Sequence, residues 1–319
     1  MRRDTFIKSM LAAMAAQALP NSAWASANLK MMIPANPGGG WDGTGRALGK
    51  ALQEAGVAAS VNYENKGGAA GALGLAQFVN ASKGDPNALM VMGAVMLGGI
   101  ITGKPPVSLS QATPLARLTI DYNVFVLPAQ SPLKTMKDVI DQLKRDPGSV
   151  KWGGGSRGST EHIAAAMLAR EVGVDASKIN YVPFRGGGEA VAAILGNNVT
   201  VGGSSYGEFQ PHIESGKMRA IAVTSGSPLK GLNIPTLREQ GFDVVIGNWR
   251  GVYGAPGITP EQRKTLIEMV VKATKTKSWA ADVERNGWFP AVKTGAEFEQ
   301  FVDNEFASLR ATMVKAGMI

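Results

Sequence analysis

Short apolar runs alternate along the chain with longer amphipathic stretches, and glycine-rich turns separate many of them. Because a strand pattern followed by a helix pattern repeats through most of the sequence, the order predicts an α/β fold. The expected strands cover residues 29–34, 60–64, 88–92, 114–119, 123–128, 150–152, 180–184, 199–201, 218–224 and 244–254. The expected helices cover residues 44–55, 135–144, 160–172, 189–195 and 207–215, with one more running from the turn at 67–71 to residue 81.

Turn and cap residues set the ends of these elements. Gly56 is expected to stop the first helix, and the glycines of 93–99 and 202–206 are expected to form a loop and a turn. Thr259 followed by Pro260 predicts the start of a long helix, with threonine as the N-cap and proline at the first helical position. Thr294 is expected to cap the last helix, which runs to about residue 316.

We interpret this order as two α/β lobes, each a sheet flanked by helices. Lobe 1 takes residues 28–124 together with about 250–319, and lobe 2 takes residues 125–249. The chain then crosses between the lobes twice, near Asn123 and near Arg250. Two crossings allow a hinge to close, and a cleft between lobes is a common place for a ligand.

The N-terminus has the pattern of an export signal. Arg2, Arg3 and Lys8 precede a short Ala/Met/Leu-rich stretch at 11–19, and Ala25-Ser26-Ala27 fits a cleavage site. The apolar stretch is far shorter than the ~20 residues that span a bilayer. We therefore expect residues 1–27 to be removed and the remaining chain to be exported and soluble, by the general or the twin-arginine route.

Composition excludes several kinds of chemistry. The 319 residues carry a formal charge of +8 and contain no cysteine, so the chain has no disulfide, no thiol nucleophile and no thiolate metal site. The lysines are scattered rather than clustered with aromatic residues, which argues against nucleic acid as a partner. The two histidines, His162 and His212, lack the spacing of metal ligands, and we expect neither a metal nor a cofactor.

Glycine-rich turns carry the strongest chemical signal. Turns at 33–45, 153–159, 185–188 and 202–206 each lead into a predicted helix, so that backbone N–H groups and the positive end of a helix dipole converge on one point. Such points attract anions. Hydroxyl and guanidinium groups in the later turns add donors that suit carboxylates, although the two arginines could equally be exposed to solvent. These donors are Ser156, Arg157, Ser159, Thr160, Arg185, Ser204, Ser205 and Tyr206.

Two short motifs suggest other functions and fit less well. Residues 38–43 match G-x-G-x-x-G with Glu64 at the end of the next strand, but Asp42 would place a carboxylate beside a dinucleotide pyrophosphate. Residues 154–158 and 203–207 match the G-x-S-x-G turn of serine hydrolases. In both, a histidine follows too closely after the serine to form a triad of the expected order.

Longer motifs resemble one protein family. Pro34–Asp42, Glu64–Gly71, Trp152–His162 and Asn248–Pro260 resemble the substrate-binding receptors of tripartite tricarboxylate transporters, also called the Bug family. The first and the last of these are most similar to the tricarboxylate-binding (TctC) branch, and the resemblance covers essentially the whole chain after residue 27.

This resemblance implies a type II-like periplasmic binding protein that is not an enzyme. It closes two lobes on a di- or tricarboxylate such as citrate and delivers it to an inner-membrane permease of one large and one small subunit. We expect a monomer. The alternatives to a transport receptor are a serine hydrolase and a ligand sensor that signals to a membrane kinase.

Site residues follow from the resemblance as well. Carboxylate oxygens would be bound by the first turn and by the turn after 150–152, with two further turns as walls. Many relatives have serine or asparagine where this chain has Arg157, which favours a more highly charged ligand. The implied binding residues are Asn36, Gly38, Gly39, Gly40, Trp41, Asp42, Ser156, Arg157, Ser159, Thr160, Arg185, Gly186, Gly187, Ser205 and Tyr206.

Overall fold

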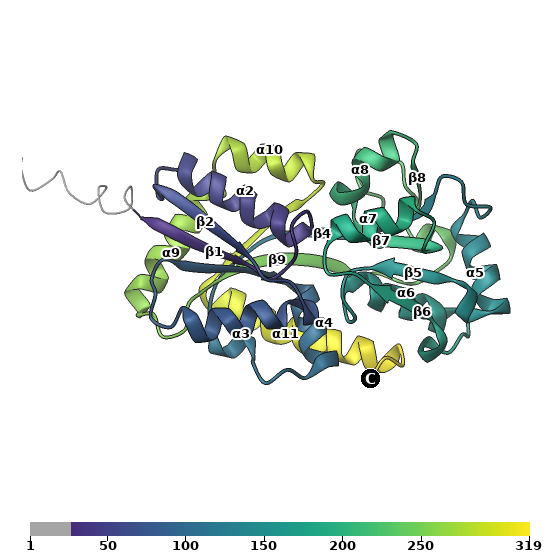
Figure 1. The fold of residues 1–319 in the computed structure, drawn as a ribbon, viewed down its shortest axis with the longest axis horizontal. Helices are drawn as coiled ribbons and strands as arrows, with labels where there is room; N and C mark the ends of the chain where they lie inside the picture. The colour runs from purple at the N-terminus through teal and green to yellow at the C-terminus, as the bar shows by residue number, and fades with distance from the viewer. Residues whose placement is uncertain (1–26) are drawn as a thin grey trace, which may run out of the picture.

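A computed structural model describes residues 27–319, so the expected export signal lies almost entirely outside the described residues. The chain forms two α/β halves that lie side by side and share one long sheet (Figure 1). The strand order β2-β1-β3-β9-β4-β7-β5-β6 runs from one half into the other. The α/β fold predicted from the alternating pattern is confirmed.

The first half contains the N-terminal and C-terminal segments of the chain. Its parallel strands are joined by β9, β4 and β10, which run antiparallel to their neighbours. Its strands are β1 (Asn28–Ile33), β2 (Ser60–Asn65), β3 (Ala88–Gly93), β9 (Gly247–Gly254), β10 (Phe289–Thr294) and the first part of β4 (Thr113–Pro128). Its helices are α2 (Gly40–Glu54), α3 (Ala72–Ala81), α4 (Ala94–Gly103), α9 (Pro260–Ala273), α10 (Lys277–Arg285) and α11 (Gly295–Lys315).

The second half is built on the remainder of β4. Residues 123–128 of that strand pair with β7 and β8, and β7 continues through β5 to β6. The strands are β5 (Lys151–Gly154), β6 (Asn180–Pro183), β7 (Val201–Ser205) and β8 (Met218–Val223). The helices are α5 (Met136–Arg145), α6 (Thr160–Glu171), α7 (Gly187–Leu195) and α8 (Tyr206–Glu214).

The central strand β4 connects the halves. Its residues up to Tyr122 pair with β9, and from Asn123 onward they pair with β7 and β8. The chain returns from the second half to the first just before Gly247, which pairs with Tyr122. Both passages therefore lie next to each other at the middle of the sheet, which places the residues of β4 and β9 there at the junction of the halves.

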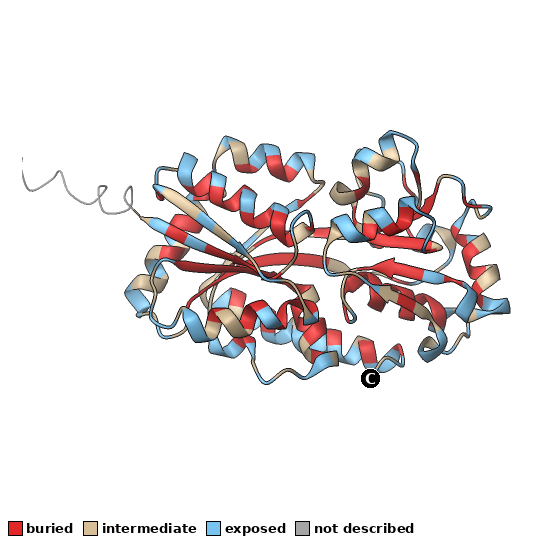
Figure 2. Ribbon diagram, in the orientation of Figure 1, coloured by how far each residue is buried: buried red, intermediate tan, exposed pale blue. Residues whose placement is uncertain are grey.

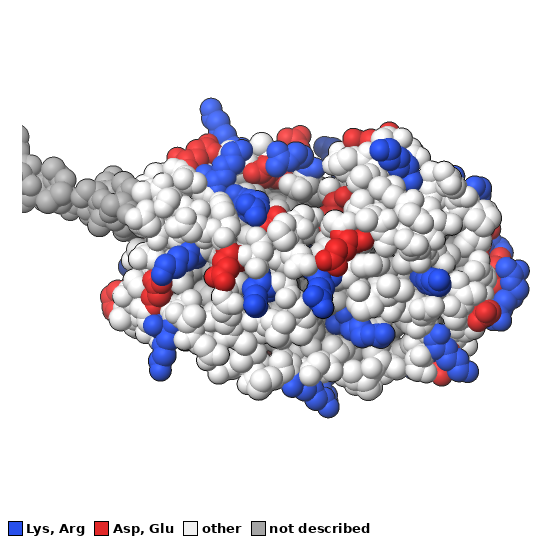
Figure 3. All heavy atoms as spheres, in the orientation of Figure 1, with Lys and Arg blue, Asp and Glu red and all other residues white. Residues whose placement is uncertain are grey.

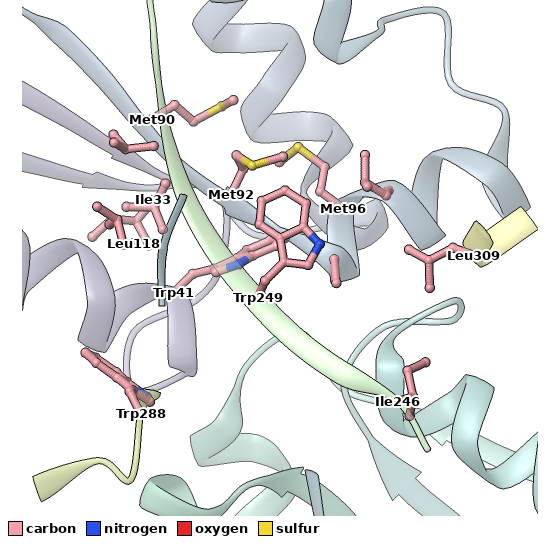
Figure 4. Close-up of a cluster of buried hydrophobic side chains, with 14 of the residues drawn as sticks. Ile33, Trp41, Met90, Met92, Met96, Leu118, Ile246, Trp249, Trp288 and Leu309 are labelled. Atoms are coloured by element: carbon pink, nitrogen blue, oxygen red, sulfur yellow. The ribbon is translucent and has the colours of Figure 1, made fainter. Parts of the chain in front are cut away.

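The sheet strands form the core, and the helices pack against them (Figure 2). Most helices bury one face, whereas α6 is buried over nearly its whole length. Trp249 of β9 is 1% exposed and packs edge-on against Phe298 and Phe301 of α11. Met92 and Met96 lie beside the same indole ring (Figure 4). No helix in 27–319 is both long enough and apolar enough to cross a bilayer.

Several predicted elements are corrected. Residues 93–99 belong largely to α4 rather than to a loop, and the expected strands 114–119 and 123–128 are a single strand. Residues 202–205 extend β7, so that the predicted turn is the end of a strand. The helix α2 begins at Gly40 rather than 44, and Thr294 makes no side-chain cap. Neither α10 nor β10 was predicted from the sequence pattern.

Close packing explains why glycine misled these predictions. In α4, a methyl group on Gly98 would lie 1.9 Å from the carbonyl oxygen of Gly158, and one on Gly99 would lie 2.1 Å from Cβ of Ala70. In β7, a methyl group on Gly202 would lie 2.2 Å from Ile194. These glycines allow neighbouring elements to approach, and none of the three has the positive φ of a turn.

Candidate functional site

A cavity lies between the two halves, where the loops that follow several strands converge. Its walls come from the carboxyl ends of β1, β2, β5, β6 and β7 and from the starts of α6, α7 and α8, while β4 and β9 form its floor. It encloses about 690 Å³ of empty space, including its open mouth. Loops at the carboxyl ends of strands are the usual location of ligand sites in α/β sheets.

The first wall is the glycine-rich turn after β1. Gly39 is the N-cap of α2 and, with Gly40 and Trp41, it lines the cavity. A methyl group on Gly40 would lie 2.5 Å from Nη2 of Arg250, so only glycine leaves room for that guanidinium. The first N–H groups of a helix have no partner within the helix and therefore remain available here to an acceptor.

Each of the four helices that point at the cavity carries an acid in its first turn: Asp42, Glu161, Glu189 and Glu208. The acids of α2 and α7 accept hydrogen bonds from the turn before their own helix, from Gly38 N–H at 3.1 Å and from Arg185 N–H at 3.2 Å. The predicted anion-binding turns are therefore already partly occupied by the protein's own carboxylates.

The other two acids line the cavity itself. Oε1 of Glu161 accepts a hydrogen bond from Gly155 N–H at 2.5 Å, and Glu208 accepts one from the hydroxyl of Ser204. Burial raises the pKa of Glu161, and nearby Glu208 raises it further. In contrast, the pKa of Asp42 is lowered: burial raises it, but hydrogen bonds from Arg46, Asn65 and Gly38 outweigh that effect.

The floor holds a buried ion pair. Nη2 of Arg250 lies 2.9 Å from Oδ2 of Asp121 and donates to the hydroxyl of Ser205 at 2.7 Å. Both charged side chains are 3% exposed. Burial raises the pKa of Asp121 to about 6, although the guanidinium of Arg250 opposes that shift.

Within residues 27–319, four polar atoms of the floor have no hydrogen-bond partner, and two of them are the carboxylate oxygens of Asp121, which does not line the cavity. Nη1 of Arg250 and Oδ1 of Asn248 are fully buried and unpartnered, and both residues line the cavity. An unpaired donor of a charged group is costly to bury. Among the residues that line the cavity, Nη1 of Arg250 therefore lacks an acceptor and Oδ1 of Asn248 lacks a donor.

The two halves touch each other beside the mouth of the cavity. Asn36 donates through Nδ2 to Oε1 of Glu189 at 2.9 Å, and its backbone N–H lies 3.4 Å from the carbonyl oxygen of Arg185. A methyl group on Gly39 would lie 3.2 Å from the amide nitrogen of Gly187. On the face of the molecule that Figure 3 draws, basic and acidic side chains are interspersed.

The structure brings eight of the sequence-predicted residues to the cavity wall: Gly39, Gly40, Trp41, Ser156, Arg185, Gly186, Gly187 and Ser205. Asn36, Gly38 and Asp42 lie beside the cavity and hold its loops in place.

Four other predicted residues do not reach the cavity. Arg157 is exposed and Tyr206 is half-buried, and neither lines the cavity. Ser159 and Thr160 are fully buried, and their hydroxyls bind the phenol of Tyr181 and the amide of Asn123.

The residues of the cavity floor and the two acids that line the cavity were not among the binding residues predicted from the sequence. Asn123, Asn248 and Arg250 come from strands, where a polar side chain in an apolar run is the available signal. Glu161 and Glu208 stand in the first turn of their helices, where an acid is common for reasons of helix stability alone. Their role as cavity lining follows only from the way the helices converge.

His162 is not paired with a serine. Its Nδ1 accepts a hydrogen bond from Gly158 N–H at 3.0 Å, and its ring stacks on Tyr181. Burial, with nearby Arg157, lowers its pKa to about 4, which keeps the ring neutral. Among residues 27–319 no hydrogen bond joins a histidine ring to a serine hydroxyl, and no three His, Asp or Glu residues are placed to hold a metal.

Comparisons with known proteins agree with this architecture. The model of the tripartite tricarboxylate transporter family receptor matches residues 46–318. Protein BugT of Bordetella pertussis is 26% identical over 282 residues, which cover 87% of this chain and 85% of that protein. The periplasmic binding protein BugD superposes with a TM-score of 0.84 at 21% identity, covering 92% of this chain and 98% of that one. MatC from Rhodopseudomonas palustris, solved with bound malate, gives 0.78 at 20% identity, with coverages of 89% and 98%.

Proposed function

The chain belongs to the receptor family of tripartite tricarboxylate transporters, and we propose that it captures a small organic carboxylate between its two halves. The family and the structural neighbours consist of solute-binding receptors. The receptor would act in the periplasm as a monomer after loss of residues 1–27, and would deliver its ligand to an inner-membrane permease of one large and one small subunit.

The unpartnered Nη1 of Arg250 is the observation that carries this proposal. Arg250 lines the cavity together with Gly39, Gly40 and Trp41, and Nη2 of its guanidinium lies next to Gly40 at the start of α2. A ligand carboxylate there would accept from the guanidinium and from the helix N-terminus together.

The sequence favours a di- or tricarboxylate such as citrate as the ligand. The bound malate of MatC, a relative of the same fold, supports a dicarboxylate within the proposed class. The acids that line the cavity argue for few negative charges on the ligand, because each added carboxylate would meet Glu161 or Glu208.

Closure of the two halves on the ligand is part of the proposal. Residues 28–124 with 250–319 would form one lobe and 125–249 the other, with the hinge where β4 and β9 meet at Tyr122 and Gly247. Walls from both lobes surround the cavity, so a ligand that touches both favours the closed form and gives the permease a shape that reports occupancy.

Thermal denaturation with a panel of organic acids tests the capture step. A ligand at 100 times its Kd adds about 2.7 kcal/mol to the free energy of unfolding, which raises the Tm by several degrees. The double variant Arg250→Met with Asp121→Asn removes the guanidinium without stranding a buried carboxylate, and it should abolish the shift. Arg157→Ala is the control, because this arginine is exposed outside the cavity and the Tm shift should persist.

A panel without any stabilising carboxylate, together with turnover of ester substrates, would refute the receptor and favour the hydrolase. Co-purification with a membrane kinase in place of the permease subunits would favour the sensor.

A further inference from the structure

One side of α11 carries an exposed apolar seam, away from the cavity. The buried side of this helix packs mainly against β4, β10 and α4. Along its outer side, one row of positions spaced three or four apart is apolar or small, apart from two charges. We call this row the α11 seam: Asp303, Phe306, Ala307, Arg310 and Val314. Phe306 is 36% exposed and Val314 is 50% exposed, and apolar side chains that are exposed together are typical of a protein contact.

A groove with an apolar floor lies along one edge of the α11 seam. It is formed by α11, α4 and the short turn at Leu109–Gln111, and it holds about 1040 Å³ of empty space, including its open side. Buried Leu97 and Val302 belong to its floor, and Asp303 and Phe306 of the seam also line it. The groove therefore leaves room beside Phe306 for apolar side chains from another molecule.

The two charged residues of the seam have opposite signs and no partner in their own chain. Among residues 27–319, neither Asp303 nor Arg310 takes part in an ion pair. They lie two helical turns apart, about 10 Å along the helix axis, and therefore on the same side of α11. Phe306 and Ala307 stand between them. The seam thus has a negative end, an apolar centre and a positive end.

This order of charges is self-complementary. When two identical helices lie antiparallel about a two-fold axis, each position meets the position that is equally far from the centre on the other side. With the centre between Phe306 and Ala307, Asp303 of each copy meets Arg310 of the other. The same rotation brings the two Phe306 side chains together at the edge that carries the groove. A second copy of the chain therefore satisfies both charges and covers the apolar centre in one contact.

We infer that two copies of this chain pair through the α11 seam, with the helices antiparallel and Asp303 of each copy bound to Arg310 of the other. The contact of one helix pair is smaller than the roughly 1,200 Å² of a stable interface, so the pairing should be reversible, with a Kd of roughly 10 µM to 1 mM. At lower concentrations the chain is the monomer of the proposed function. Because the seam lies outside the cavity, pairing and ligand capture are independent.

Sedimentation equilibrium of the wild-type protein and charge-reversal variants tests the inference. Between about 1 µM and 1 mM, the average mass of the wild type should rise from that of a monomer toward that of a dimer. Asp303→Arg places like charges against each other at both ends of the seam, and it should raise the Kd of pairing at least about tenfold. Arg310→Asp should do the same with the opposite sign. Both residues are exposed, so each variant should keep the wild-type Tm.

Two combinations should restore pairing, because each brings opposite charges back together. The double variant Asp303→Arg with Arg310→Asp should form a homodimer again, since it exchanges the two signs. An equimolar mixture of the two single variants should form a heterodimer, although each variant alone does not pair. Glu284→Arg is the matched control: it makes the same change of charge at an exposed position of α10, on the opposite face of the first half (Figure 1), and should leave the Kd unchanged.

Three results would overturn the inference. The first is a wild-type protein that stays monomeric up to about 1 mM. The second is a dimer that Asp303→Arg leaves intact, because another surface would then hold the two copies together. The third is pairing that is lost in the single variants and restored neither in the double variant nor in the mixture, because the two charges would then not face each other. None of these results bears on ligand capture, so the receptor function would stand.

Discussion

The substitution Gly98→Ala tests whether the contact between the halves forms only on closure. Gly98 of α4 faces Gly158, which precedes α6, and the two meet backbone to backbone. A methyl group on Gly98 would lie 1.9 Å from the carbonyl oxygen of Gly158, and one on Gly158 would lie 2.5 Å from the carbonyl oxygen of Gly98. The variant therefore acts as a wedge between the two halves.

The magnitude follows from that distance. Ordinary contact begins at 3.4 Å, so the two backbones must separate by about 1.5 Å to accept the methyl group. Overpacking of this kind costs about 1–3 kcal/mol. If only the closed form is destabilised, this corresponds to a ligand Kd roughly 5- to 150-fold higher. In the open form the methyl group is accommodated, and replacing glycine within a helix stabilises the fold by up to about 1 kcal/mol.

Two measurements together test whether the contact forms only in the closed protein. Calorimetry with the tightest-binding carboxylate should show the weakened affinity, while urea denaturation of the ligand-free protein should show a free energy of unfolding that is unchanged or slightly higher. Gly103→Ala, at the end of the same helix with no atom within 4 Å of the added methyl group, is the control for both. A ligand-free protein that loses stability while its affinity stays the same would refute the reasoning, because the contact would then belong to a permanent core.

Three further predictions concern the floor, the pH response and the mouth. Arg250→Met should lower the free energy of unfolding in urea by about 3–5 kcal/mol, because it leaves the buried carboxylate of Asp121 without its cation. Adding Asp121→Asn should restore most of that stability. Equal stability of the single and double variants would contradict the ion-pair account. The pKa of His162 is lowered from 6.5 to about 4, so its contribution of about 3 kcal/mol is present above pH 6.5 and lost as the pH falls toward 4. The pKa of Asp121 is raised to about 6, so Asp121 has the opposite effect and stabilises the fold as the pH falls below 6. The variant His162→Gln should therefore gain stability relative to wild type on acidification. Parallel plots of stability against pH for the two proteins would contradict this prediction. Asn36→Ala removes the bridge to Glu189 at the exposed mouth and should speed ligand dissociation in stopped-flow measurements by an amount worth about 0.5–1 kcal/mol; an unchanged rate would show that the bridge does not hold the closed form.

Local sequence signals predicted the elements whose cause is local. Thr259 accepts a hydrogen bond from Gln262 N–H and forms a capping box, as threonine before proline suggests. Apolar runs located β1, β3 and β8 to within a residue or two, because a buried strand requires such a run wherever it lies. The predicted α/β fold followed from the order of these elements.

Where a glycine served a contact distant in sequence, local signals failed. Gly98 and Gly99 in α4 are required by Gly158 and Ala70, which approach from other elements. Nothing within 93–103 distinguishes a glycine that opens a turn from one that admits a neighbour. The same limitation hid β10, because its pairing partner β4 lies more than 150 residues earlier in the chain.

Arginine shows the same limitation in the site. Arg157 stands among glycines in a turn before a helix, where a cation is well placed to meet an anion, yet the structure leaves it exposed. Arg250 stands between Trp249 and Gly251 in an apolar strand and is 3% exposed at the floor of the cavity. A charge within a strand pattern must have a buried partner or a ligand, and that physical requirement was the better signal.

The acids at the helix starts change how glycine-rich turns attract a ligand. Asp42, Glu161 and Glu189 each accept a hydrogen bond from a backbone N–H of the turn before their own helix, and Glu208 accepts one from the hydroxyl of Ser204 in β7. The dipoles of the four helices are therefore partly compensated within the protein. The turns then contribute shape and a few free N–H groups, and they contribute little net positive potential. Selectivity has to arise from atoms that remain unpartnered, namely Nη1 of Arg250 for an acceptor and Oδ1 of Asn248 for a donor. Counting glycine turns therefore overestimates the negative charge that the cavity can accept, because each turn already holds one carboxylate of its own.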